Sequence, residues 1–179
     1  MVIGITGKSG SGKSTLCKNI CKYTNFVHID VNDIAYEVLN EPEIKKEVEK
    51  RYGFSFKKTS KVVTLDIVFN SRKIMKETYS IIYDKITERV NTIIDNNENV
   101  IIDYMYLPEY PFFKRCDIKI LMTALISIRS ERVIEKDNIS YNYFMIREKN
   151  SIDYIDENYT YIINSINHNK KDEDLNNKI

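Results

Sequence analysis

Residues 2–20 read VIGITGKSGSGKSTLCKNI. The first five of these residues form a short apolar run, which is typical of a buried strand. Gly7, Gly10 and Gly12 interrupt the run, and a stretch with helical character follows from Lys13 onward. We therefore expect a strand, a glycine-rich loop and a helix in direct succession.

The loop itself, residues 7–14, matches the pattern G-x-x-x-x-G-K-[ST]. In such a loop the backbone N–H groups and the start of the helix face phosphate oxygens. A fortuitous glycine-rich turn is the alternative, but this match follows a predicted strand and opens a predicted helix. Lys13 is expected to reach the β- and γ-phosphates of ATP, and Ser14 to hold Mg²⁺. The residues expected to bind ATP here are Gly10, Ser11, Gly12, Lys13, Ser14 and Thr15.

Further apolar segments predict strands at residues 26–29, 99–103, 118–122 and 159–163, and we expect those at 99–103 and 118–122 to be buried. Between them, apolar spacing of three and four predicts helices near residues 33–39 and 43–51 and a long one within 65–95. Strands that alternate with helices imply an α/β fold. We expect a three-layer sandwich around a parallel sheet of about five strands, with its ligand beyond their carboxyl ends.

The length of 179 residues suits one domain, which we expect to span residues 1–166. Within this domain, we expect a helical substrate-side region at about residues 33–97 and a short helical lid at about residues 129–151. Residues 167–179 are polar and are expected to form a loose tail.

The composition excludes several classes of partner. The chain carries 27 basic and 26 acidic side chains, so its net charge of +1 does not favour nucleic acid. Neither a membrane span nor a basic leader is evident, so we expect a cytoplasmic protein, a monomer or weak homo-oligomer. Cys17 and Cys21 lie one helical turn apart, but with Cys116 alone they lack the second pair of a zinc site. Reduced, packed cysteines are expected.

Glycine usage separates the classes of nucleotide-binding protein. The last glycine is Gly53, so no Asp-x-x-Gly turn is left to sense a γ-phosphate, which argues against a GTPase. The guanine-reading pattern at residues 169–172 lies in the polar tail. Asp103 is followed by Tyr104 rather than by a second carboxylate that would activate water, so hydrolysis is not indicated. Phosphoryl transfer to the hydroxyl of a small molecule remains.

Two carboxylates follow predicted strands. Asp30 should stand beside the phosphate loop, where it could orient an acceptor hydroxyl or take its proton. It could instead cap the helix expected from Asp33, but Asn32 would serve equally well as that cap. Asp103 could hold Mg²⁺ through water or contact the substrate, or could be an ordinary turn residue. His28, in an apolar segment, is expected to pack in the core.

Basic residues are spaced three and four apart after the fourth strand, at Arg129, Arg132 and Lys136, and Arg147 and Lys149 follow. This spacing is typical of a helical lid that brings arginines onto phosphates and excludes water. A solvated charged face is the alternative. Arg132 is the expected catalytic residue of the lid, and Arg147 is expected to bind ATP.

The order of these motifs resembles the dephospho-CoA kinase family over most of residues 1–166. The glycine-rich opening is similar, and HIDVNDIA at residues 28–35 resembles the family's Asp-Ala-Asp segment, with Asp30 as the first Asp. LDIVF at 65–69, RVIEKD at 132–137 and YIIN at 161–164 resemble three later segments. The resemblance implies transfer of the ATP γ-phosphate to the ribose 3′-hydroxyl of dephospho-CoA.

Three positions differ from the family pattern. Asn32 replaces its second Asp and Lys136 a lid Arg, while residues 104–107, YMYL, replace Pro-Leu-Leu. Asn32 and Asp103 are nevertheless expected, with Asp30, to contact the acceptor. A nucleoside or nucleoside monophosphate kinase would suit the same phosphate loop. A nucleotide-binding regulatory protein with weak turnover is a third interpretation, suggested by these replacements.

Overall fold

The structure is a computed structural model that describes residues 1–52, 72–155 and 157–166. The predicted segment at 65–69 and the tail at 167–179 lie outside the described residues. None of the helices in the described part is both long and apolar enough to cross a membrane.

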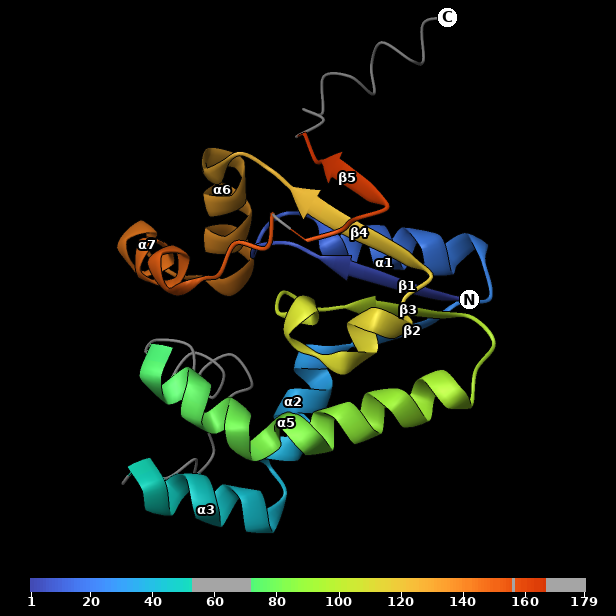
Figure 1. The fold of residues 1–179 in the computed structure, drawn as a ribbon. Coiled ribbons are helices and arrows are strands. Elements are labelled where there is room, and N and C mark those ends of the chain that lie inside the picture. Colours follow the sequence, from blue (N-terminus) through green and yellow to red (C-terminus); the bar gives the residue numbers. More distant parts are fainter. Residues whose placement is uncertain (53–71, 156, 167–179) are drawn as a thin grey trace, which may run out of the picture.

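A five-stranded sheet forms the centre of the structure (Figure 1), in the order β2-β3-β1-β4-β5 with every neighbouring pair parallel. The strands are β1 Val2–Thr6, β2 Val27–Asp30, β3 Val100–Asp103, β4 Ile118–Thr123 and β5 Tyr161–Asn164. The predicted parallel α/β sheet is confirmed. Strand β5 pairs only with β4 at the sheet edge, and all four of its residues are exposed.

Helices cover both faces of this sheet. They are α1 Lys13–Tyr23, α2 Val31–Leu39, α3 Pro42–Tyr52, α5 Arg72–Asp95, α6 Ile126–Asp137 and α7 Tyr141–Asn150, with short 3₁₀ helices η1 Leu107–Glu109 and η2 Pro111–Arg115. Figure 1 shows α2 and α5 on the opposite side of the sheet from α1, with α6 and α7 beyond the carboxyl ends of the strands. The expected lid region is therefore a pair of helices at the edge where the phosphate loop lies.

Alternation along the strands sorts their side chains between two hydrophobic clusters. Ile29, Val100 and Ile102 belong to the larger cluster, which packs against α2, α3 and α5. Ile101 points the other way and joins the smaller cluster with Cys17 of α1. Since Asp103 lies two residues beyond Ile101, it falls on the α1 side, facing the helix that the phosphate loop opens.

Residues 104–107, which differ from the family pattern, build part of the larger cluster. Tyr104 and Leu107 are completely buried, and the Tyr104 ring makes an edge contact with Tyr110 at a centroid distance of 5.6 Å. Tyr110 in turn stacks on Phe112. The replacement of Pro-Leu-Leu therefore supplies an aromatic core between β3 and β4.

Candidate nucleotide and acceptor site

A cavity of about 600 Å³ lies at the carboxyl ends of the strands. Its lining combines the phosphate loop, the strand-end carboxylates and the lid helices. These lining residues include Gly10, Gly12, Lys13, Ser14, Thr15, Asp30, Asn32, Asp103, Met105, Tyr106, Arg132, Lys136 and Arg147. The strand register explains this convergence, since β2 and β3 pair Asp30 with Asp103 and β1 and β3 pair Ile5 with Asp103. Of the predicted site residues, only Ser11 is not part of the lining; it is buried in the loop.

The phosphate loop requires glycine at Gly10 and Gly12. Their φ angles are +78° and +97°, in a region that side chains disfavour, and a Cβ on Gly10 would lie 2.6 Å from the Arg129 carbonyl oxygen. Gly12 precedes α1 and provides no side-chain cap. The N–H groups of the first turn of α1 are therefore available to donate hydrogen bonds to phosphate oxygens.

Lys13 extends beneath the loop, where its Nζ donates a long hydrogen bond of 3.4 Å to the Lys8 carbonyl oxygen. Burial lowers the pKa of Lys13 below its usual value, although the Asp103 carboxylate opposes this effect. Such a cation gains strongly when an anion enters its surroundings. Lys13 lines the cavity together with Gly12 and Ser14 of the loop.

Ser14 and Asp103 meet at the predicted Mg²⁺ position, where Ser14 Oγ donates a 2.6 Å hydrogen bond to Asp103 Oδ2. Asp103 Oδ1 is buried without a hydrogen-bond partner in the described part of the chain. Burial would raise the pKa of Asp103, but His28, Lys13 and Ser14 together hold it below its usual value. A hydroxyl beside an ionised carboxylate with an unused oxygen fits the oxygen ligands that Mg²⁺ prefers.

Asp30 both caps α2 and lines the cavity. The helix begins at Val31, and Asp30 Oδ1 accepts hydrogen bonds from the backbone N–H of Asn32 at 2.9 Å and from its Nδ2 at 3.0 Å. The predicted helix start near Asp33 is therefore wrong, and Asn32, the alternative cap, lies within the first turn. The half-buried Asp30 has a structural role, and its carboxylate still faces the cavity.

The two predicted lid arginines reach the cavity from different helices. Arg132 of α6 donates to the Gly10 carbonyl oxygen at 3.0 Å and to Ser165 Oγ at 2.7 Å, so it already contacts the phosphate loop. Arg147 of α7 forms an ion pair with Asp137 at 2.7 Å. Both side chains line the cavity.

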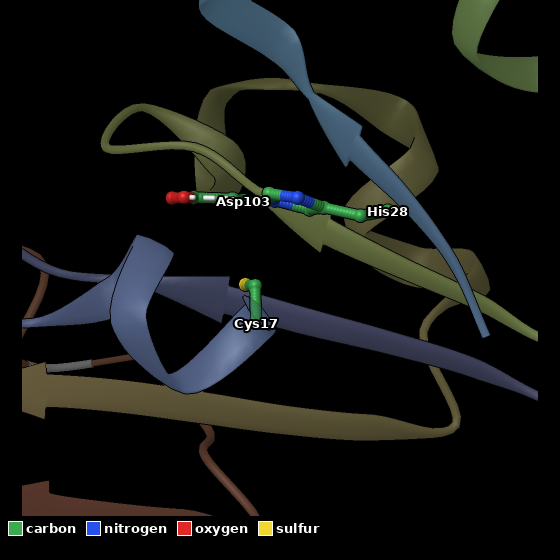
Figure 2. Close-up of side chains that lie close together, drawn as sticks. All are labelled: Cys17, His28 and Asp103. Carbon is green, nitrogen blue, oxygen red and sulfur yellow. Dashed lines mark ion pairs between the residues drawn. The ribbon is translucent and has the colours of Figure 1, made fainter. Parts of the chain in front are cut away.

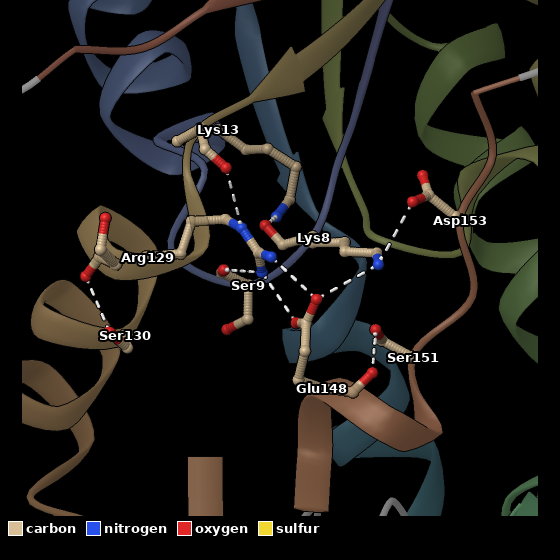
Figure 3. Close-up of polar contacts among 10 residues, drawn as sticks. Lys8, Ser9, Lys13, Arg129, Ser130, Glu148, Ser151 and Asp153 are labelled. Carbon is tan, nitrogen blue, oxygen red and sulfur yellow. Dashed lines mark hydrogen bonds and ion pairs between the residues drawn. The ribbon is translucent and has the colours of Figure 1, made fainter. Parts of the chain in front are cut away.

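A charge cluster that the sequence did not reveal joins the lid to the other side of the loop (Figure 3). Glu148 accepts two 2.8 Å hydrogen bonds from the Arg129 guanidinium and a third, of 3.2 Å, from Lys8. Arg129 also donates to the Ser9 carbonyl oxygen at 3.4 Å. We call Lys8, Arg129 and Glu148 the latch. Its partners lie up to 140 residues apart in the chain, so helical spacing predicted a lid or a charged face for Arg129 but not these contacts.

Contrary to the prediction of a core role, His28 is partly exposed and lies beside a carboxylate. Its side chain is 24% exposed, and its Nε2 lies 3.8 Å from Asp103 Oδ2. Figure 2 shows that His28 of β2 and Asp103 of β3 face Cys17 of α1. The only sequence signal was the strand pairing, which places alternate residues of β2 and β3 on one face.

Comparison with known proteins identifies the family. A family model described as an AAA domain matches residues 3–156. Dephospho-CoA kinase of Borreliella burgdorferi is 30% identical over 74% of this chain and 67% of its own length. Cytidylate kinase of Pyrococcus abyssi is 26% identical over 78% of this chain and 63% of its own length.

Structural similarity extends over the whole chain. The crystal structure of TT1252 from Thermus thermophilus has a TM-score of 0.74 and 18% identity, covering 100% of this chain and 98% of that one. This similarity shows the fold alone. Together with the family match and the relative at 30% identity, it agrees with the parallel sheet and phosphate loop described above. The chain belongs to the AAA-domain family of P-loop proteins and, within it, to the dephospho-CoA kinase family.

Proposed function

We propose that this protein transfers the γ-phosphoryl group of ATP to the ribose 3′-hydroxyl of dephospho-CoA. The observation that carries this proposal is the shared cavity of Lys13 and Asp30, which combines a phosphate-binding cation with a half-buried carboxylate two strands away. A nucleotide binder without transfer would need that carboxylate only as the cap of α2. The family to which the chain belongs supports dephospho-CoA as the acceptor.

The loop and Lys13 would hold the triphosphate and compensate its charge. Backbone N–H groups at the start of α1 would bind the phosphate oxygens, while Lys13 would approach the β- and γ-phosphates. Ser14 would hold Mg²⁺ directly and Asp103 would hold it through water; when bound, the ion neutralises charge on the β- and γ-phosphates. Arg132 and Arg147 would approach from the lid and exclude water from the transferring group.

Asp30 would act on the acceptor. Its carboxylate would accept the proton of the 3′-hydroxyl as the acceptor oxygen forms a bond to the γ-phosphorus and the bond to the bridging oxygen of ADP breaks. Two hydrogen bonds from Asn32 hold one oxygen of Asp30, Oδ1. Asn32, which replaces an Asp of the family, would therefore orient the carboxylate and leave Oδ2 for the acceptor.

A kinase of nucleoside monophosphates is the second candidate, because cytidylate kinases are also similar to this chain. Its acceptor chemistry differs from that of the first candidate in two ways. The acceptor group is a phosphate rather than a hydroxyl, and the reaction needs no proton-accepting carboxylate.

We place the reaction in the cytoplasm and expect a small-molecule acceptor, with no role for nucleic acid or membrane.

Rates of ADP formation with separate acceptors would test the proposal. The acceptors are dephospho-CoA, CMP, AMP and deoxyadenosine, each with ATP and Mg²⁺, and the control is ATP without an acceptor. We expect the highest kcat/KM with dephospho-CoA. A higher value with CMP would favour the second candidate, and ATP binding without transfer to any acceptor would favour a regulatory protein.

A further inference from the structure

Cys17, His28 and Asp103 form a cluster of three different metal-ligating side chains behind the phosphate loop (Figure 2). One ligand atom from each residue lies within 4.8 Å of the other two. They come from α1, β2 and β3, so secondary structure fixes all three backbones. The cluster borders the cavity only through Asp103, and neither Cys17 nor His28 has a part in the mechanism above.

The protein satisfies only part of the polar atoms of this cluster: Asp103 Oδ2 accepts a hydrogen bond from Ser14 and lies 3.8 Å from His28 Nε2. His28 Nε2 and Asp103 Oδ1 are both buried without a hydrogen-bond partner among the described residues. The Asp103 side chain is only 2% exposed, and Cys17 is completely buried. Because buried polar atoms nearly always have a hydrogen-bond partner, these two neighbouring atoms have the capacity to coordinate a bound cation.

The mixture of donors selects the class of ligand. Mg²⁺ and Ca²⁺ take oxygen ligands, whereas a thiolate, an imidazole and a carboxylate together suit Zn²⁺ and similar divalent transition metals. Three protein ligands leave a fourth tetrahedral position for water. Tetrahedral Zn²⁺ with bonds of about 2.0–2.3 Å places its ligands roughly 3.6 Å apart, so a contraction of about 1 Å would complete the site.

We propose that Cys17, His28 and Asp103 bind one Zn²⁺-class cation and that this binding inhibits the enzyme. On binding, the Cys17 thiol releases its proton to solvent and the sulfur bonds to the metal. The bound cation is coordinated by Asp103. Without the cation, this carboxylate accepts the Ser14 hydrogen bond at the Mg²⁺ position. Two divalent cations sharing one carboxylate beside Lys13 repel each other, so occupation of this site weakens the binding of ATP with Mg²⁺.

Titration of the full chain with Co²⁺ or Cd²⁺, under reducing conditions and without ATP, tests the binding directly. We expect one equivalent to produce a sulfur-to-metal charge-transfer band that Zn²⁺ abolishes by competition. Cys17→Ser should lose the band, and His28→Gln should weaken binding. Cys21→Ser, on the same helix but outside the cluster, should keep both. A band that survives in Cys17→Ser, or one that Cys21→Ser removes, would overturn the site, as would absence of a band in the parent.

Two further readouts keep the test decisive. Melting curves would show whether Cys17→Ser is folded; if it is not, His28→Gln decides, because His28 is partly exposed, and unchanged affinity in that variant overturns the site. Zn²⁺ should also reduce turnover of the parent and of Cys21→Ser more than that of Cys17→Ser. This second arm rests on the proposed function, whereas the spectroscopic arm does not. Binding with equal inhibition of all three chains would overturn the inhibitory role alone.

Discussion

Two groups of charged side chains flank the phosphate loop, and they differ in how completely their hydrogen bonds are satisfied. In the latch, both oxygens of Glu148 are occupied by Arg129, and Oε1 also accepts from Lys8. On the cavity side, Lys13 has one long hydrogen bond to a carbonyl, and Asp103 Oδ1 has no partner in the described part of the chain. The latch is complete without a ligand, whereas the cavity group is not.

This difference separates stability from function. Buried charges that satisfy one another stabilise a particular arrangement, here the lid against the loop. Buried charges that lack partners cost free energy unless a ligand supplies them, and they cluster where chemistry takes place. We therefore expect substitutions on the cavity side to reduce activity with little change in stability. Substitutions in the latch should reduce stability with little change in activity.

The largest effect is expected for Lys13→Ala. Removal of this cation should abolish measurable transfer and weaken ATP binding, because Lys8, the other lysine of the loop, is paired with Glu148. Calorimetry with ATP and a transfer assay would measure both. Lys18→Ala, which removes an exposed lysine from the same helix, is the matched control. Near-normal turnover of Lys13→Ala would contradict the assignment of the loop.

Asp30→Asn should have the next largest effect on activity. Asn preserves the size of the side chain and caps helices as well as Asp does, so the melting temperature and ATP affinity should change little. Loss of the proton acceptor should lower kcat by roughly 100-fold or more. Asp33→Asn, in the first turn of the same helix, serves as control. Retained activity would restrict Asp30 to its capping role and direct attention to Asp103.

Arg132→Ala should lower kcat by roughly 10- to 100-fold and raise the KM for ATP much less, because a lid arginine acts mainly on charge in the transition state. Steady-state kinetics with varied ATP would separate the two constants. Arg115→Ala removes an arginine that pairs with Asp95 away from the cavity, and it should leave both constants unchanged. Equal kinetics of Arg132→Ala and the parent would reduce Arg132 to a structural contact.

Glu148→Gln should chiefly affect stability. It removes the charge that pairs with the buried Arg129 guanidinium, so we expect the free energy of unfolding to fall by about 1–3 kcal/mol. Glu41→Gln removes a comparable but more exposed pair with Lys85 and Arg89, and should cost at most about 1 kcal/mol. Denaturant unfolding of both variants would measure the difference. Equal losses would show that the latch is no stronger than a surface pair.

The pH dependence sharpens this prediction. Hydrogen bonding to Arg129 lowers the pKa of Glu148 on folding, despite the opposing effect of burial. Its contribution is therefore fully present above the unfolded pKa of about 4.3 and is lost as pH falls through the lower folded pKa. The stability gap between the parent and Glu148→Gln should close over that range. A gap that stays constant in acid would contradict the latch.

Local patterns in the sequence predicted the parts of this structure that depend on local geometry. The phosphate loop follows from glycine spacing, and the sheet follows from apolar runs that alternate with helices. Asp30 and Asp103 could be expected together because parallel strands end at one edge. The dual role of Asp30 could not be predicted, because whether Asp30 caps the helix depends on whether the helix starts at residue 31 or near residue 33.

The parts that the sequence did not reveal depend on contacts between distant segments. Glu148 and Lys8 meet only because α7 folds back over the loop, and no spacing pattern encodes that contact. His28 looked like a core residue because its neighbours are apolar; the Asp103 carboxylate beside it comes from another strand. The same limit applies to Tyr104. Its burial and its contact with Tyr110 give a structural reason for a departure from the family pattern that had suggested weak turnover.

One competition reaction tests the central claim most directly. Equal concentrations of dephospho-CoA and CMP would be incubated with labelled ATP, Mg²⁺ and limiting enzyme, and the labelled products would be separated and their phosphate positions determined by phosphorus NMR. We predict that the label enters dephospho-CoA at the ribose 3′-oxygen, and that Asp30→Asn removes this product. Label on the phosphate of CMP, or on neither acceptor, would contradict the proposed reaction.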